Sequence, residues 1–368
     1  MTELPRRVRV LDGDPRDWLA IERALDAQGH PVGLHHRPSF LAATAVKRAW
    51  LLLAEDAGGQ PLGAAAATIE PTRALPGFLI AELPRFGPSL CRDDHAAMLQ
   101  ALARQARRSM RVLRVRLDLL ATDDDERTAL CKAAGALGFV REPSFRMYSN
   151  TLVVDLDREI DALDHSIDRG ARRNAKKMED LGHRVRAIMD ARLAPRLDAL
   201  VRETMQRSSG PQLEHDWERL IAYSREHPRH SRIAGMFLNG REDPESLVAF
   251  RWCGNHGPYV EDLVAASTRL KPPLPLMHAV AWDMLHWGHE VGAKWFDFGG
   301  IPSPDTPPDS PLHGIAAFKR MFSKQETRIR EQMVMVTSPV ANRCARAIAG
   351  LRRRSAFMPT GDAPDPSG

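Results

Sequence analysis

The apolar and polar positions of the first 140 residues alternate between strand-like and helix-like patterns. Apolar and basic residues alternate over 6–11, and two apolar runs at 50–54 and 62–69 flank a turn at Gly58-Gly59. Alternation with period two predicts half-buried strands, and a short Gly-containing turn between apolar runs predicts a hairpin. Further strands are expected at 78–83 and 112–119, with helices from Asp14-Pro15 and over 93–110 and 123–135.

The second half of the chain repeats this order of elements with little sequence identity to the first. Since strands and helices intermix in both halves, the pattern predicts an α/β fold with mixed sheets, built from two tandem units. We expect domains at 1–149 and 150–340, a C-terminal helix at 341–354 and a disordered tail at 355–368. Expected strands are 151–156, 233–237, 247–252, 259–265 and 295–298, and expected helices are 159–181, 194–207, 214–226 and 275–290.

Composition narrows the class of protein. The 368 residues carry a net charge of +5, and the four cysteines are far apart without a CxxC pair, which argues against a disulfide framework or a zinc site. His278, His286 and His289 lack the i, i+4 spacing of a helical metal site, so no metal is expected. No apolar run approaches ~18 residues and no signal-peptide pattern opens the chain, so a cytoplasmic protein without a membrane span is expected.

Several common catalytic motifs are absent from the sequence: it has no GxSxG elbow, no Walker loop and no GxGxxG. The loop before the predicted helix at 275–290 reads Lys271-Pro272-Pro273-Leu274-Pro275. Proline has no N–H, so this loop is poorly suited to hold the pyrophosphate of coenzyme A at a helix N-terminus. No cofactor is therefore expected.

A basic stripe is predicted on the helix that opens the second half. Arg169, Arg172, Arg173 and Lys176 fall at i, i+3, i+4 and i+7 and share one face. With Lys177, Arg184, Arg186 and the nearby acids, residues 168–186 hold a net charge of +4. Such a stripe is either a solvated helix face or a surface that binds phosphates of tRNA or of a nucleotide-linked substrate.

The stretch 295–322 combines an apolar strand, a loop rich in Pro, Asp and Ser over 301–312, and a basic-aromatic helix. Phe318 and Phe322 are four apart and share a helix face, whereas Lys319 points elsewhere. A cation held beside an apolar pair can stabilise an oxyanion or bind a phosphate, although a solvated basic surface is the ordinary alternative. Two acids in apolar strands, Asp262 and Asp297, are candidate general bases, and Asp297 also fits a structural role.

Four stretches, in order, resemble the Fem family of peptidoglycan bridge-forming aminoacyl transferases and its relatives with duplicated GNAT-type acyltransferase domains. They are AELPRFGPSL at 81–90, the basic segment at 150–185, GAKWFDFGGI at 292–301 and GIAAFKRMFS at 314–323. The resemblance spans about 80–325 and implies two tandem GNAT-like domains. Two departures are Ser323, where the family usually has Gly, and the lack of a long helical arm between 186 and 230.

The resemblance implies transfer of an aminoacyl group from aminoacyl-tRNA to an amine of a peptide, small molecule or cell-wall precursor, without coenzyme A. By position, Lys319 matches the family's active-site lysine, Tyr259 a substrate-contacting tyrosine, and Arg172 and Arg173 the basic helix. Two other functions stay open: an acyl-CoA-dependent N-acyltransferase, and an inactive binding module of the same fold. The candidate site residues are catalytic Lys319, Asp262 and Asp297, substrate-binding Tyr259, Phe318, Arg251 and His313, and phosphate-binding Arg169, Arg172, Arg173 and Lys176.

Overall fold

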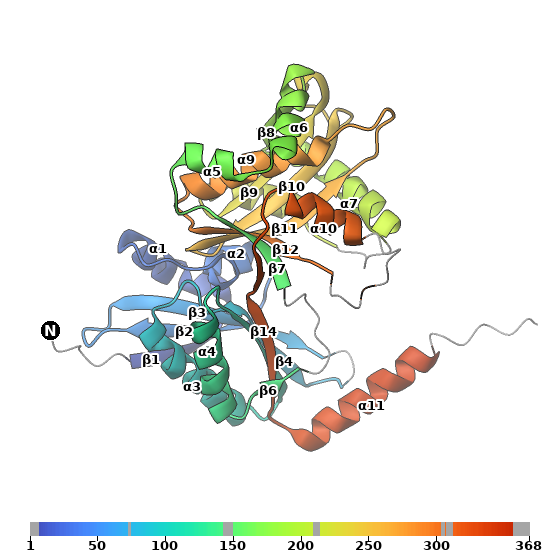
Figure 1. Cartoon of the computed structure of the whole chain (residues 1–368). Helices are drawn as coiled ribbons and strands as arrows, with labels where there is room; N and C mark the ends of the chain where they lie inside the picture. Colours follow the sequence, from blue (N-terminus) through green and yellow to red (C-terminus); the bar gives the residue numbers. More distant parts are fainter. Residues whose placement is uncertain are drawn as a thin grey trace, which may run out of the picture.

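The computed structural model describes residues 7–72, 75–142, 150–208, 214–302, 306 and 312–355. Within them, the chain forms two seven-stranded mixed sheets, one in each half of the molecule (Figure 1). Both sheets are antiparallel except for one parallel pair of neighbouring strands. The predicted fold class, a mixed α/β fold of two similar tandem units, is therefore confirmed.

The first sheet has α1 (Leu19–Ala27) and α2 (Pro38–Ala43) on one face and α3 (Arg92–Arg108) and α4 (Asp124–Ala136) on the other. Its central strands are buried along most of their length, because helices cover both faces of the sheet. In spatial order they are β1 (Arg7–Gly13), β2 (Ala49–Glu55), β3 (Pro61–Pro71), β4 (Leu79–Phe86), β5 (Val112–Leu120), β14 (Arg330–Val336) and β6 (Val140–Arg141).

The second sheet repeats the arrangement with α7 (Ala194–Ser208) and α8 (Trp217–Glu226) on one face and α9 (Leu276–Glu290) on the other. A last helix of this unit, α10 (Leu312–Arg320), precedes the final strand of this sheet. In spatial order the strands are β13 (Glu326–Arg328), β7 (Asn150–Asp155), β12 (Trp295–Gly300), β11 (Tyr259–Ser267), β10 (Leu247–Asn255), β9 (Ser231–Phe237) and β8 (Arg184–Ala187).

The chain crosses between the two sheets twice, so the predicted second domain, 150–340, does not coincide with the second sheet: its last strand, β14, is exchanged into the first. After β6 the chain crosses to the second sheet, where β7 inserts between β12 and β13. After β13 it returns to the first sheet, where β14 inserts between β5 and β6. Residues 330–336 thus belong to the first sheet, although they lie within the predicted domain 150–340 (Figure 1).

The helix expected over 159–181 is two helices, α5 (Ile160–Ser166) and α6 (Arg169–Asp180). The break lies at Ile167, which is extended and buried, and at Asp168, whose carboxylate accepts the Gly170 N–H at 2.6 Å. An aspartate that caps a new helix stabilises the break. Because of this break, α6 starts beside the end of α10, where the Asp168 N–H donates to the Met321 carbonyl at 3.0 Å.

The last described helix, α11 (Pro339–Ser355), projects from the first unit (Figure 1). The predicted tail beyond it, and most of the predicted loop at 301–312, lie outside the described residues. In the part of the chain that the structure describes, no helix has both the length and the apolar character needed to cross a membrane.

Candidate active site

The parallel strands of the second sheet separate part-way along their length. β11 and β12 pair at three positions, from Tyr259 with Trp295 to Glu261 with Asp297. Beyond these pairs β11 continues to Ser267 and β12 to Gly300 without pairing to each other. We call the space between these unpaired strand ends the β11–β12 opening. Backbone groups that do not pair across a sheet are free to bind another partner.

Lys319 of α10 occupies this opening. Its Nζ donates to the Gly300 carbonyl oxygen at 2.7 Å. A β-carbon at Gly299 would lie 3.7 Å from Lys319 Nζ and 3.7 Å from the Asp262 carbonyl oxygen, so the lysine and both strands converge here. Gly299 has a φ of 74°, a conformation that favours glycine, and this turns its N–H toward Asp297 Oδ1 at 2.7 Å.

Burial lowers the pKa of Lys319 to about 8, although Asp262 and Asp297 oppose the shift. Arg251 adds to the lowering. A lysine with a pKa close to the ambient pH can act as a cation or as a proton donor and acceptor, and such pKa shifts cluster at functional sites. The side chain is therefore equipped for chemistry as well as for packing.

Asp262 and Arg251 form a buried ion pair beside Lys319. The Arg251 guanidinium lies over two aromatic rings, 5.3 Å from the centre of Phe298 and 5.4 Å from that of Phe318. Burial raises the pKa of Asp262 in spite of Arg251 and Lys319. Its Oδ1 atom has no hydrogen-bond partner among the described residues, which leaves one carboxylate oxygen able to accept a proton.

Asp297 is tied to the backbone and to its neighbours. Its Oδ1 accepts hydrogen bonds from the Thr151 hydroxyl and from the Gly299 N–H. Arg330 of the exchanged strand β14 lies 3.9 Å from Oδ2. Burial raises the pKa of Asp297 as well. These contacts give Asp297 a positioning role, because they fix the turn at Gly299 against which Lys319 rests.

Aromatic packing holds α10 in place. Phe318 and Phe322 contact each other at 5.2 Å between ring centres, and Phe322 lies 5.2 Å from Phe298 on β12. His278 on α9 meets the edge of Phe318 at 5.0 Å. The shared face predicted from the i, i+4 spacing is thus buried against the sheet, which directs Lys319 into the β11–β12 opening.

The opposite face of β11 meets the first unit through a buried ion-pair cluster. Glu261 accepts hydrogen bonds from Arg85 at 2.5 and 2.9 Å and from Arg330. Burial alone would raise the pKa of Glu261, but Arg330 and Arg85 outweigh it and hold the pKa well below its usual value. Arg85 comes from β4 and Arg330 from β14, so this carboxylate joins the two sheets.

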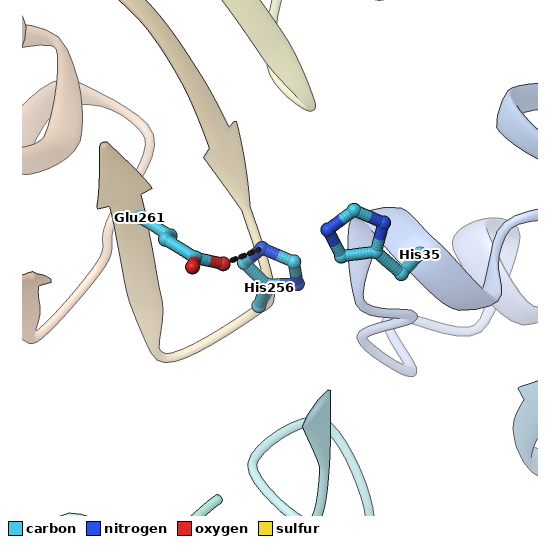
Figure 2. A group of neighbouring side chains, drawn as sticks. All are labelled: His35, His256 and Glu261. Carbon is cyan, nitrogen blue, oxygen red and sulfur yellow. Dashed lines mark ion pairs between the residues drawn. The ribbon is translucent and has the colours of Figure 1, made fainter. Parts of the chain in front are cut away.

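His35, His256 and Glu261 in this cluster are the residue types of a metal site (Figure 2). Their ligand atoms lie within 4.8 Å of one another, and burial lowers the pKa of both histidines. However, both Glu261 oxygens already face the guanidinium groups of Arg85 and Arg330. Two fixed positive charges at the only anionic ligand oppose a metal cation, so the group serves better as an interface cluster.

Several solved structures share the arrangement of the two units. FemX matches with a TM-score of 0.69 at 15% identity, over 89% of this chain and 97% of FemX. This chain has the FemX fold. Two further solved structures have similar folds. L-PGS from Bacillus licheniformis matches with a TM-score of 0.53 at 16% identity, over 92% of this chain and 98% of L-PGS. The C-terminal domain of a putative lysylphosphatidylglycerol synthetase from Agrobacterium fabrum matches with a TM-score of 0.52 at 14% identity, over 90% of this chain and 96% of that domain. No protein-family model matches the sequence, and neither does any curated protein.

Within this FemX fold, four residues named from sequence meet at the β11–β12 opening, namely Lys319, Asp262, Arg251 and Phe318, with Asp297 at its edge. His313 lies exposed on the first turn of α10, next to this group in sequence. The structure does not bring Tyr259 to Lys319. Tyr259 is buried on the Glu261 side of β11, with its ring stacked 4.9 Å from His256, because alternate residues of a strand face opposite sides.

The basic stripe lies on α6, where Arg169, Arg173 and Lys176 are exposed and Arg172 is half-buried. None of these four forms an ion pair with a described residue. Arg184 and Arg186, which the sequence adds to the stripe, lie instead on β8, where Arg186 pairs with Glu242. The stripe is therefore shorter than predicted.

The sequence does not single out Arg85, Arg330 or Glu261 as site residues. One signal was present: Glu261-Asp262 is an acidic pair inside an apolar strand, and two adjacent strand residues face opposite sides. Both acids therefore need buried cations, one on each face. No comparable pattern marks the arginines, since their partners are distant in the sequence.

Proposed function

We propose that this protein is an N-acyltransferase that forms an amide bond, taking an aminoacyl group from aminoacyl-tRNA and passing it to an amine. The observation that carries the proposal is the Lys319 ammonium in the β11–β12 opening, between the carbonyl of Gly300 and the carboxylates of Asp262 and Asp297. The FemX fold supports it, since the Fem family, which the sequence resembles, uses this donor. Because a fold alone does not define an activity, the proposal rests on the residues of the site.

In the proposed reaction the acceptor amine attacks the ester carbonyl of the donor. A C–N bond forms, the C–O bond to the tRNA ribose breaks, and the amine proton ends on the released hydroxyl. The ester is already activated, so no covalent enzyme intermediate is needed. Lys319 stabilises the oxyanion of the tetrahedral intermediate or protonates the departing oxygen. Asp262, with its unpartnered Oδ1, accepts the amine proton, and Asp297 holds the Gly299 turn.

The surroundings favour a tRNA donor over coenzyme A. α9 starts at Leu276, directly after prolines at 272, 273 and 275, and prolines lack the N–H donors of a pyrophosphate cradle. The exposed cations on α6 start beside the end of α10, where they form a surface for a polyanion close to Lys319. The amine of a peptide, a small molecule or a cell-wall precursor is the acceptor class, and the protein acts without a cofactor.

The test supplies both donor classes to the full-length protein. Bulk tRNA charged with labelled amino acids and a panel of labelled acyl-CoAs are each incubated with a dialysed metabolite and peptide fraction, and new amides are identified by mass spectrometry. We expect labelled amides from charged tRNA only. Transfer from acyl-CoA alone would favour the CoA-dependent alternative, and strong salt-dependent tRNA binding without transfer from either donor would favour the binding module.

A further inference from the structure

A cavity of about 380 Å³ lies beside Phe318, between the end of β11, α7 and the starts of α9 and α10. This volume is within the range of ~300–1,000 Å³ that small-molecule sites occupy. Its walls combine apolar side chains with three guanidinium groups. The apolar lining residues are Ala265, Ala266, Met277, Ile315 and Phe318, and the arginines are Arg207, Arg251 and Arg269.

Two of these arginines form no ion pair within the part of the chain that the structure describes. Arg207 donates to the Ser267 carbonyl oxygen at 2.5 Å and to the Thr204 hydroxyl at 3.1 Å, which are both neutral acceptors. Among the described residues, no carboxylate forms an ion pair with Arg207 or Arg269. By contrast, Arg196 on the same helix as Arg207 pairs with Glu203 at 3.2 Å, and Arg251 pairs with Asp262.

Arg207 and Arg269 also influence each other electrostatically. Partial burial lowers the pKa of Arg207, the positive charge of Arg269 lowers it further, and the carboxylate of Glu203 opposes the shift. The repulsion between two cations at the wall of a cavity raises the free energy of the empty site, and an anionic ligand would relieve this repulsion. The hydrogen bonds of Arg207 to Ser267 and Thr204 hold its guanidinium in one orientation, so the site is formed before a ligand arrives.

The cavity connects to the proposed chemistry through Arg251 and Phe318. Arg251 lines the cavity and pairs with Asp262 at the β11–β12 opening, while Phe318 lines the cavity and precedes Lys319 in α10. A ligand in the cavity therefore lies next to the reacting centre. Guanidinium groups bind phosphate through paired N–H donors, and the apolar wall suits a base or another flat group attached to it.

We propose that Arg207 and Arg269 bind a phosphate ester of the acyl donor in this cavity, with the adjoining nucleoside against the apolar wall. This proposal rests on the proposed function. The same chemistry is offered by the 3′-terminal phosphodiester of tRNA and by the phosphates of coenzyme A, and the proposed function selects the former. The site is separate from the basic stripe on α6, which would contact phosphates farther along the tRNA.

The test measures binding without turnover. The full-length protein is titrated calorimetrically with the trinucleotide CCA, which ends every tRNA, and separately with coenzyme A. We expect CCA to bind, and Arg207→Gln and Arg269→Gln each to weaken it about tenfold, the typical loss for a hydrogen bond to a charged group. Each variant should also reduce the slope of log affinity against log salt by about one. Arg202→Gln is the matched control, because Arg202 is exposed on the same helix.

The outcomes separate this proposal from the proposed function. The phosphate site would be overturned, even if transfer is observed, if neither CCA nor coenzyme A binds. It would also be overturned if Arg207→Gln and Arg269→Gln bind as tightly as Arg202→Gln while their melting temperatures match that of the wild type. Coenzyme A bound through Arg207 and Arg269, with CCA unbound, supports the phosphate site and contradicts the tRNA donor. If Arg207→Gln perturbs folding, Arg207→Lys, which keeps the charge but not the paired N–H donors, should keep the salt dependence of the wild type and lose part of the affinity.

Discussion

The two units have the same strand order but differ where their parallel strands meet. In the first sheet, β4 and β5 pair from Leu79 with Val112 to Phe86 with Leu119, almost to their ends, with an interruption between Leu83 and Phe86. In the second, β11 and β12 pair at only three positions and then separate around Lys319. A paired sheet satisfies its own backbone groups, whereas a separated one offers them to a side chain or ligand. Duplication thus supplies two scaffolds, of which the second has the opening that the proposed chemistry requires.

The helices that follow these strands differ in the same way. In the second unit α10 carries Lys319, buried and with its pKa lowered to about 8. In the first unit the corresponding helix is α4, whose Lys132 is exposed to solvent. The comparison shows that a lysine on the corresponding helix need not be buried. The role proposed for Lys319 rests on its burial between separated strands, which changes its proton affinity and provides partners.

The largest expected effect is on turnover in Lys319→Ala. We expect transfer to fall by a factor of about 10²–10³, the usual loss when one group that stabilises an oxyanion is removed. Lys132→Ala on α4 is the matched control and should turn over like the wild type. Initial rates at saturating donor are compared after correction for uncatalysed ester hydrolysis. Equal rates for the two variants would remove the distinction between the units.

The next effect concerns the exchanged strand and is measured as stability. Arg330→Met leaves Glu261 without one of its two guanidinium partners and removes the cation beside Asp118 and Asp297. We expect a loss of about 3–5 kcal/mol in the free energy of unfolding, as for other broken buried pairs. Arg9→Met, which removes the half-exposed pair with Glu55, should cost at most about 1 kcal/mol. Urea denaturation compares the two, and equal losses would contradict the structural role of the exchange.

The smallest effect is expected at Tyr259, on the interface side of β11. Its hydroxyl donates to Glu261 at 3.5 Å, so Tyr259→Phe should lower stability by only about 0.5–1.5 kcal/mol. Because the ring faces away from Lys319, both kcat and KM should stay within twofold of the wild type. A large rise in KM would instead support the substrate-contacting role that the resemblance implies for Tyr259, and would mean that substrate also contacts the Glu261 side of β11.

Much of this fold follows from local pattern. Alternating apolar residues mark β1 and β5, and the i, i+4 pair Phe318 and Phe322 marks the buried face of α10. The pattern does not tell which sheet a strand joins, so the placement of β14 in the first sheet was not predictable. Period two identifies the buried residues of a strand but not its neighbour.

The candidate site was predictable to a similar degree. Lys319 stands in a recognisable motif, and Asp262 and Asp297 are acids in apolar strands, which draws attention to them. Arg207 and Arg269 come together only through tertiary packing, as do Arg85 and Arg330 around Glu261. Tyr259 shows the converse: a residue two positions from Glu261 shares its face, so strand alternation alone would have placed it away from Asp262.

The most direct test of the account is the pH dependence of transfer. Since the pKa of Lys319 is lowered to about 8, the ammonium is present below that pH and is lost as the pH rises through it. If the cation acts in the reaction, kcat should fall above about pH 8, and Lys319→Arg, which stays charged, should retain its residual activity at higher pH. A wild-type rate that rises through pH 8, or a falling limb that is the same in Lys319→Arg, would contradict the role of the Lys319 ammonium.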